Sequence, residues 1–187
     1  MNIAFDVDGV VLNSIDYILE HINRTLGTKL TQSHLFSWEL ESLGVDFTTM
    51  WDAVSYMYSQ AYIEPYHAAV DVLTRIHHAT GEPLLFITGR REPDTALRQL
   101  RALKWNSTRP EMIVTGGDRD KRIYLAEKDV HFIVEDDVEY AEQYVEAGIG
   151  FGMMRRPWNK ETKAPVTRIF NGWNDLENWF FSREESR

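Results

Sequence analysis

The sequence predicts an α/β fold in which a mostly parallel sheet carries helices on both faces. From residue 65 onward, short apolar runs alternate with segments of helical periodicity, a pattern typical of parallel sheets. Before that point, one apolar run near the N-terminus is followed only by helical patterns. A helical stretch directly after the first strand predicts an insertion. We therefore divide the chain into a core of residues 1–13 and 65–187 and a helical cap of residues 14–64.

The first half of the chain supplies the first two strands and the cap. Residues 3–7 form a short apolar run that Gly9 ends, which predicts a buried strand and a tight turn. Apolar residues then recur at helical spacing, and Pro65 begins a further helix that Gly81 follows. A second buried strand is expected at residues 83–88. Helices are expected at residues 15–26, 31–43, 47–58 and 65–80.

The second half repeats the alternation of strand and helix. Strands are expected at residues 111–115, 131–135 and 148–154, with a further edge strand at 167–170. The helices between and after them are expected at residues 92–104, 118–128, 137–147 and about Trp173–Phe180.

The composition excludes several classes of site and partner. There is no cysteine, which excludes disulfides, thiolate zinc sites and cysteine nucleophiles. No apolar run approaches a membrane span, and the first residues do not resemble a signal peptide, so we expect a soluble, cytoplasmic protein. The sequence leaves the oligomeric state open.

Charge makes a nucleic-acid polymer an unlikely partner. The formal net charge is −9, whereas binding of many phosphates needs clustered Lys and Arg. Basic residues do gather within residues 90–109 and 155–168. Those two stretches are interpreted either as a field focused on a small anionic substrate or as solvated surface.

Polar residues stand where the predicted strands end. Asp6 and Asp8 follow the first strand, Thr88 and Gly89 end the second, and Asp136 follows the strand at 131–135. Because ligands bind beyond the carboxyl ends of parallel strands, we expect these side chains to converge. Lys121 and Asp137 are expected to join them.

This set of residues fits phosphoryl transfer. A carboxylate such as Asp6 can attack phosphorus and form an acyl phosphate, and a divalent cation must relieve the repulsion between the two anions. Magnesium prefers hard oxygen ligands, for which Asp6 and Asp136 are the natural candidates. Asp8 can act as general acid and then general base, while Thr88 and Lys121 hold the phosphoryl oxygens.

The motifs together resemble the haloacid dehalogenase superfamily of phosphatases. The resemblance covers residues 2–154: Asp6-Val7-Asp8-Gly9 matches the first motif, Leu84 to Thr88 the second, Lys121 the third and Asp136-Asp137 the fourth. It implies a Rossmann-like core and identifies the helical insertion as a C1-type cap. It also implies Mg²⁺ as cofactor. The implied site has Asp6 and Asp8 as catalytic residues, Thr88, Gly89 and Lys121 as phosphate ligands, Asp6, Asp8 and Asp136 as metal ligands, and Asp137 in support.

More narrowly, the chain resembles the 5′(3′)-deoxyribonucleotidase group. The resemblance lies in Arg119-Asp120-Lys121, in Glu135-Asp136-Asp137, in Ala147-Gly148-Ile149 and in Arg156-Pro157-Trp158-Asn159. It implies that the substrate is a small phosphorylated molecule, a nucleoside monophosphate.

Several alternatives stay open. Thr88-Gly89-Arg90 suggests a 3′-phosphatase acting on nucleic-acid ends, and another small metabolite could be the substrate. A non-enzymatic module that binds a phosphorylated ligand is a third reading. The aromatic residues Phe47, Trp51 and Tyr58 are expected to form the core of the cap, and Trp38 is a candidate for stacking on a base.

Overall fold

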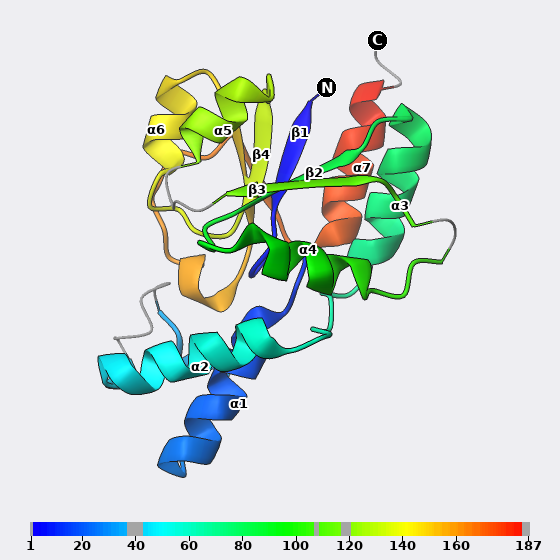
Figure 1. Ribbon diagram of the computed structural model, residues 1–187. Helices are drawn as coiled ribbons and strands as arrows, with labels where there is room; N and C mark the ends of the chain where they lie inside the picture. The colour runs from blue at the N-terminus through cyan, green and yellow to red at the C-terminus, as the bar shows by residue number, and fades with distance from the viewer. Residues whose placement is uncertain (1, 37–42, 107–108, 117–120, 185–187) are drawn as a thin grey trace.

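A computed structural model describes residues 2–36, 43–106, 109–116 and 121–184. The described residues form one six-stranded sheet in the order β3-β2-β1-β4-β5-β6, and every neighbouring pair is parallel (Figure 1). The predicted mostly parallel α/β sheet is therefore confirmed, with the 167–170 strand at one edge. The strands are β1 (Ile3–Asp6), β2 (Leu84–Thr88), β3 (Met112–Gly116), β4 (Phe132–Glu135), β5 (Gly150–Met154) and β6 (Arg168–Phe170).

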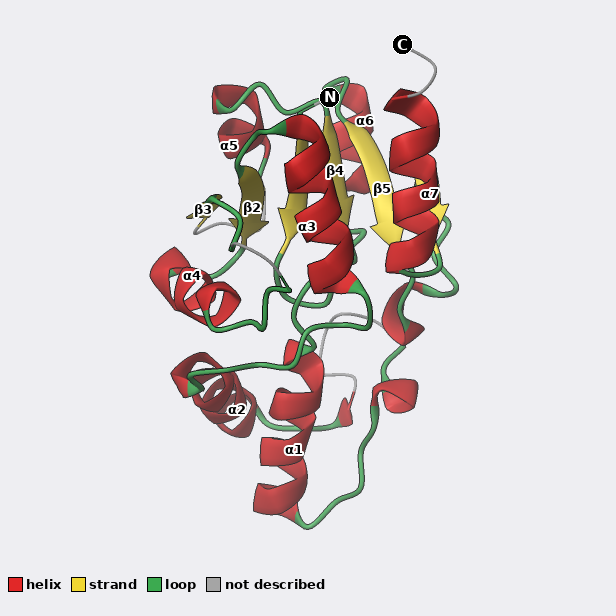
Figure 2. Ribbon diagram, turned by 90° about the vertical axis from the view of Figure 1, so that its right-hand side faces the viewer, coloured by secondary structure: helices red, strands yellow, loops and turns green. Residues whose placement is uncertain are grey.

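Helices cover both faces of the sheet. On β1, Phe5 points toward the face covered by α3 (Ala69–Thr80), α4 (Pro93–Arg101) and α7 (Trp173–Glu184) (Figure 2). Its neighbour Ala4 points to the opposite face, where α5 (Arg122–Glu127) and α6 (Ala141–Glu146) pack. This alternation follows from the two-residue period of a strand, and it divides the apolar core into two layers.

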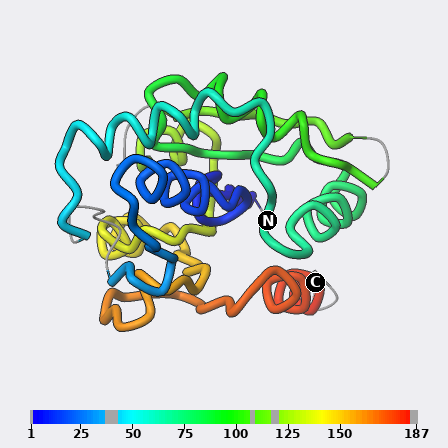
Figure 3. Tube along the Cα trace, turned by 90° about the horizontal axis from the view of Figure 1, so that it is seen from below, coloured from blue at the N-terminus to red at the C-terminus, as the bar shows by residue number. Residues whose placement is uncertain are grey.

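Two further helices lie beyond the carboxyl ends of the strands. They are α1 (Ser14–Leu26) and α2 (Phe47–Ser59), which pack against each other (Figures 1 and 3). In α1, the buried residues Ile15, Ile18, Leu19 and Ile22 have the spacing of one helical face, and Gly27 ends the helix at φ 68°. Asp46 caps the start of α2, because its side chain accepts a hydrogen bond from Thr49 N at 3.0 Å. Two 3₁₀ turns, η1 (Gln32–His34) and η3 (Pro157–Asn159), complete the described elements.

The chain leaves and re-enters the core at adjacent points. Asn13 N donates to Glu64 O at 2.9 Å, and Tyr66 N donates to Val11 O at 2.9 Å. These paired crossings lie at the predicted limits of the cap, residues 14 and 64. The division into core and cap stays a prediction.

Three helix predictions were wrong in their bounds. Residues 32–34 form only a 3₁₀ turn and Leu35 is extended, while residues 37–42 of the predicted 31–43 helix lie outside the described part. The helix expected at Pro65 begins at Ala69. Pro65 forms an isolated β-bridge with Leu12, and the backbone N–H of Tyr66 donates a hydrogen bond to Val11 O, so the chain is not yet helical there.

The helix expected at residue 137 begins at Ala141. The preceding residues form a turn in which Asp137 Oδ1 accepts from Glu139 N at 3.1 Å.

Within the described residues, no helix combines the length and apolar character needed to cross a membrane.

Candidate active site

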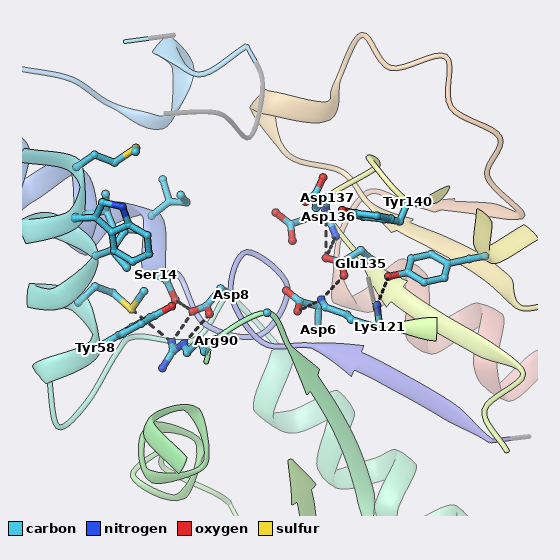
Figure 4. Close-up of a pocket in the computed structure, with 18 residues that line it drawn as sticks. Asp6, Asp8, Ser14, Tyr58, Arg90, Lys121, Glu135, Asp136, Asp137 and Tyr140 are labelled. Atoms are coloured by element: carbon cyan, nitrogen blue, oxygen red, sulfur yellow. Dashed lines mark hydrogen bonds and ion pairs between the residues drawn. The ribbon is translucent and has the colours of Figure 1, made fainter. Parts of the chain in front are cut away.

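The carboxyl ends of β1 and β4 bring a buried ionic cluster together. Asp6 is the last residue of β1 and Glu135 the last of β4, and both are buried. Lys121, directly before α5, reaches both: its Nζ donates to Asp6 Oδ1 and, at 2.5 Å, to Glu135 Oε2 (Figure 4). Burial opposes the charge on Lys121, but the two carboxylates prevail and raise its pKa. Lys121 therefore lies beside Asp6 at this edge of the sheet, and its expected role as a phosphate ligand stays a prediction.

A third buried carboxylate completes the cluster. One oxygen each from Asp6, Glu135 and Asp136 lies within 4.8 Å of the others. Three carboxylates share the ammonium of Lys121 and the more distant charge of Arg156, so negative charge is in excess if all three are ionised. Burial and then the charge of Glu135 raise the pKa of Asp6 and of Asp136 well above 3.8. This charge excess and the all-oxygen donor set fit a hard divalent cation such as Mg²⁺.

The position of Asp136 is fixed from two sides. Trp158 Nε1 donates to Asp136 Oδ2 at 2.8 Å, and Asn159 Nδ2 donates to Asp136 O at 2.9 Å. Both partners come from η3. On the other side lies Gly9, where a Cβ atom would stand 2.2 Å from Asp136 Oδ2. The glycine of the first motif is therefore needed for space as well as for its positive φ of 81°.

Asp8 belongs to a second group of contacts, on the α1 and α2 side of the pocket. Arg90 Nε donates to Asp8 Oδ2 at 2.7 Å and Arg90 Nη2 donates to Oδ1 at 2.5 Å. Ser14 Oγ also donates to Asp8 Oδ1. Burial favours the protonated acid, but the charge and hydrogen bonds of Arg90, with Ser14, outweigh it and lower the pKa of Asp8. Figure 4 shows the two groups facing each other across the pocket.

The pocket between them has a volume of about 440 Å³. Its core side is polar, whereas α1 and α2 supply an apolar wall. The prediction that Phe47, Trp51 and Tyr58 form the cap core was wrong for Phe47 and Trp51, which are 65% and 44% exposed. Tyr58 does pack against the apolar core, and Tyr58 and Trp51 both line the pocket. The wall is made by Ile15, Ile18, Met50, Trp51, Val54, Met57 and Tyr58.

The remaining predicted residues lie at or beside the pocket. Gly89 lines it, and so does Asp137, whose N–H donates to Glu135 Oε1 at 3.2 Å. Thr88 is buried at the end of β2, where its Oγ1 accepts from Arg90 N at 3.2 Å. Trp38 and residues 118–120 lie outside the described part of the chain.

Two residues gain a place that the sequence motifs did not give them. Glu135 stands in the acidic cluster between Asp6 and Asp136, and the run of acids at 135–137 was the available signal. Arg90 is only 1% exposed, and its guanidinium nitrogens donate to Asp8 and Gln99. It therefore is not part of a solvated surface, which was one interpretation of the basic residues within 90–109. The carboxylate of Asp8 is turned to Arg90 rather than into the acidic cluster.

Similarity to known proteins lies in the fold. No family model and no curated protein matches the sequence. Three of the solved structures that it resembles are a hydrolase of the haloacid dehalogenase-like family from Streptococcus pneumoniae, a candidate beta-phosphoglucomutase from Thermotoga maritima and a dehalogenase. The first is 15% identical with a TM-score of 0.63, covering 95% of this chain and 97% of that one. The second is 17% identical with a TM-score of 0.62, covering 97% and 99%.

The dehalogenase is 13% identical with a TM-score of 0.62, covering 95% of this chain and 96% of that one. At such identities the likeness concerns the fold alone, and proteins of different chemistry share it. The chain therefore has the Rossmann-like α/β fold of haloacid dehalogenase-like hydrolases.

Proposed function

We propose that the protein is a magnesium-dependent phosphomonoesterase that uses Asp6 as nucleophile. The observation that carries the proposal is the buried cluster of Asp6, Lys121, Glu135 and Asp136 at the carboxyl edge of the sheet. A halide leaves as a stable anion, whereas the alkoxide of a phosphate monoester needs a proton. The presence of Asp8 and of a carboxylate cluster that could hold a cation therefore favours phosphate over halide chemistry.

The first step transfers the phosphoryl group to the protein. An oxygen of Asp6 forms a bond to phosphorus while the bond from phosphorus to the leaving oxygen breaks, and that oxygen takes a proton from Asp8. In the free protein Arg90 keeps Asp8 ionised, and the negative charge of a bound phosphate beside it would raise the pKa of Asp8 so that it carries this proton. Lys121 provides positive charge beside the attacking carboxylate. A bound Mg²⁺, held by Asp6, Glu135 and Asp136, would neutralise charge between the carboxylate and the phosphate.

The second step releases phosphate. A water oxygen attacks phosphorus, its proton passes to Asp8, and the bond between Asp6 and phosphorus breaks. Asp8 returns to the protonated form and Asp6 to the carboxylate, so one water is consumed for each ester cleaved.

We further propose that the substrate is a nucleoside monophosphate. The apolar wall, with Trp51 and Tyr58, offers a surface for a planar base, while the acidic cluster with its cation would receive a single phosphate. The net charge of −9 favours a mononucleotide over a polymer, whose further phosphates would meet an acidic surface.

A panel of phosphomonoesters tests the proposal. The panel holds 5′- and 3′-deoxynucleotides, sugar phosphates and 3′-phosphorylated oligonucleotides, each measured with Mg²⁺ and with a chelator. We expect hydrolysis that disappears with the chelator and returns with Mg²⁺. Asp6→Asn keeps the shape of the side chain but cannot attack, so it should abolish turnover. Full activity in chelator, or in Asp6→Asn, would exclude this mechanism.

The alternative of a 3′-phosphatase on nucleic-acid ends is separated by salt. An oligonucleotide held through several basic residues should lose affinity steeply as salt rises, and a mononucleotide only weakly. We expect higher kcat/KM for the mononucleotide and a shallow salt dependence. A preference for the oligonucleotide with a steep slope would favour the end-processing activity, and binding without turnover would favour a phospho-ligand module.

A further inference from the structure

We infer that Arg90 is a positioning residue for Asp8, and that Gln99 holds Arg90 in register with the end of helix α2. The inference rests on the proposed function, because it assigns the residue that sets the general acid of that reaction. It comes from one network of buried side chains that joins the core to the wall of the pocket.

The bidentate contact between Arg90 and Asp8 fixes both the position and the rotation of the carboxylate. Two nitrogens of the guanidinium, Nε and Nη2, each donate to a different oxygen of Asp8. Such a planar fork sets both the distance and the rotation of a carboxylate, which a lysine ammonium cannot do. The Asp8 side chain keeps 16% exposure, whereas Arg90 keeps only 1%. Arg90 is therefore placed to orient Asp8 from behind, with the exposed part of Asp8 left facing the pocket.

Arg90 is itself held by a neutral partner. Its Nη1 donates to Gln99 Oε1 at 2.8 Å, and Gln99 is completely buried in α4. A buried guanidinium with unpaired nitrogens would be costly, so this contact stabilises the pairing with Asp8. The Gln99 side chain thus uses its only acceptor on Arg90 and keeps its two donor hydrogens for other groups.

Those donors reach the end of α2. Gln99 Nε2 donates to Met57 O at 3.0 Å and to Gln60 O at 2.9 Å. Arg90 also contacts this segment directly, because Met57 Sδ lies 3.4 Å from Nη2 and the Tyr58 ring centroid lies 4.8 Å from Cζ. Met57 and Tyr58 line the pocket. The same network therefore fixes the general acid and the wall that would contact the leaving group.

The consequence concerns one proton. When the bond between phosphorus and the leaving oxygen breaks, the proton moves from an oxygen of Asp8 to that leaving oxygen. Misplacing Asp8 matters most when the leaving group is a poor one, because an alcohol cannot leave without a proton. It matters little for 4-nitrophenol, which leaves readily as an anion.

The test compares Arg90→Lys with the wild type on two substrates. One is 4-nitrophenyl phosphate and the other is a phosphate ester of a primary alcohol, both measured with Mg²⁺ as kcat/KM. General acid catalysis contributes about 10²- to 10⁴-fold, so we expect a loss of roughly 10- to 100-fold for the alkyl ester. The loss for the nitrophenyl ester should be at least about tenfold smaller. Gln99→Met, which roughly keeps the volume and removes the acceptor for Arg90 together with the donors to Met57 O and Gln60 O, should show the same dependence with a smaller loss.

Two controls isolate the effect. Arg91→Lys changes the exposed neighbouring arginine and should leave both values unchanged. In an Asp8→Asn background, Arg90→Lys should cause little further loss, because its action passes through Asp8. Circular dichroism and thermal unfolding verify that each variant is folded.

The outcomes separate the inference from the proposed function. Equal losses on both substrates, or a full further loss in the Asp8→Asn background, would show that Arg90 only supports the fold. Should Arg90→Lys not fold, Gln99→Met decides by the same criterion. If the wild type hydrolyses neither ester, the proposed function fails and the inference fails with it.

Discussion

Gly9 illustrates how closely the site is packed at the level of single residues. Its φ of 81° places it in the left-handed region, and a Cβ atom there would stand 2.2 Å from an Asp136 oxygen. Gly27 has a similar φ of 68°, but a Cβ atom added to it would meet nothing within 4 Å. Substitution therefore strains the backbone at both glycines, but only at Gly9 does the added Cβ atom clash with Asp136.

Gly9→Ala should impair the metal site more than the fold. The added methyl group must displace Asp136, and a displacement of about 1 Å in an active site can cost on the order of 100-fold in rate. We expect a lower kcat and a higher Mg²⁺ concentration for half-maximal activity. Gly27→Ala is the matched control and should lower thermal stability without changing the Mg²⁺ requirement. An unchanged Mg²⁺ requirement in Gly9→Ala would remove Asp136 from the metal site.

Among single residues, those that stand at the carboxyl ends of strands could be predicted from the sequence. Asp6 and Asp136 were predicted because both follow buried apolar runs, and Lys121 because of its place in the motif order. Arg90 was not assigned a role, since its partner Asp8 is 82 residues away in the chain and no local pattern marks the pair. Among the neighbouring arginines, only tertiary packing distinguishes a buried guanidinium from a solvated one.

At the level of elements, β5 depends on two glycines that make room for aromatic rings. Gly152 lies between Phe132 and Phe170, and a Cβ there would stand 2.6 Å from a ring carbon of each. Gly152 is paired with Val134 of β4 and Arg168 of β6, so the strand cannot shift freely. The small residue thus permits the aromatic packing under α7.

Gly152→Ala should therefore destabilise the protein by overpacking. Inserted methylenes in a packed core cost about 1–3 kcal/mol, and urea unfolding would measure the loss. Gly172→Ala is the control, because nothing lies within 4 Å of its added Cβ and no left-handed φ is imposed. If Gly152→Ala lowers the free energy of unfolding no more than this control does, the rings of Phe132 and Phe170 can move aside without an energetic cost.

Helix α2 should contribute to substrate choice through Trp51. The side chain lines the pocket and is 44% exposed, so truncation removes contact surface without opening the core. Stacking of a base on an aromatic ring is worth about 1–3 kcal/mol, which predicts that Trp51→Ala lowers kcat/KM for a nucleotide by roughly 5- to 150-fold. A small alkyl phosphate should be affected much less. Leu26→Ala, an exposed apolar change on α1 outside the pocket, serves as control, and equal losses on both substrates would exclude stacking.

Periodicity predicted most elements because each buries one face. The apolar face of α1 recurs at the expected spacing, and the strands of the sheet coincide with the apolar runs. The bounds near residues 65 and 137 were wrong because hydrogen bonds to distant or turn residues hold the chain extended there. Local sequence cannot show that Val11 takes the N–H of Tyr66.

At the level of the whole molecule, part of the negative charge is buried, where ionised carboxylates lower the stability of the fold. The chain carries a net charge of −9, and three of its carboxylates are buried together beside one lysine. Burial raises the pKa of Asp6 and Asp136 above the usual 3.8. In the absence of metal, these groups favour folding fully below their usual pKa, and that stability is lost as pH rises through the raised values. The pKa of Asp8 is lowered, so its own stabilisation is lost only as pH falls.

Magnesium should therefore stabilise the protein, and more strongly at higher pH. Because the pKa values of Asp6 and Asp136 are raised, the cation competes with protons for these carboxylates, so affinity rises as pH increases. Ligand at about 100 times its dissociation constant adds roughly 2.7 kcal/mol, which for a chain of this length corresponds to a Tm increase of about 5–10 °C. We expect this increase at about pH 8 and a smaller one at about pH 6. Thermal unfolding with Mg²⁺ and with chelator at both pH values measures this increase in Tm.

Asp136→Asn is the matched control. It should lose most of the Mg²⁺ effect, because the variant can keep the hydrogen bond from Trp158 but removes one charge from the cluster. Equal Mg²⁺ shifts in the variant and the wild type, or a shift that falls as pH rises, would place the cation elsewhere.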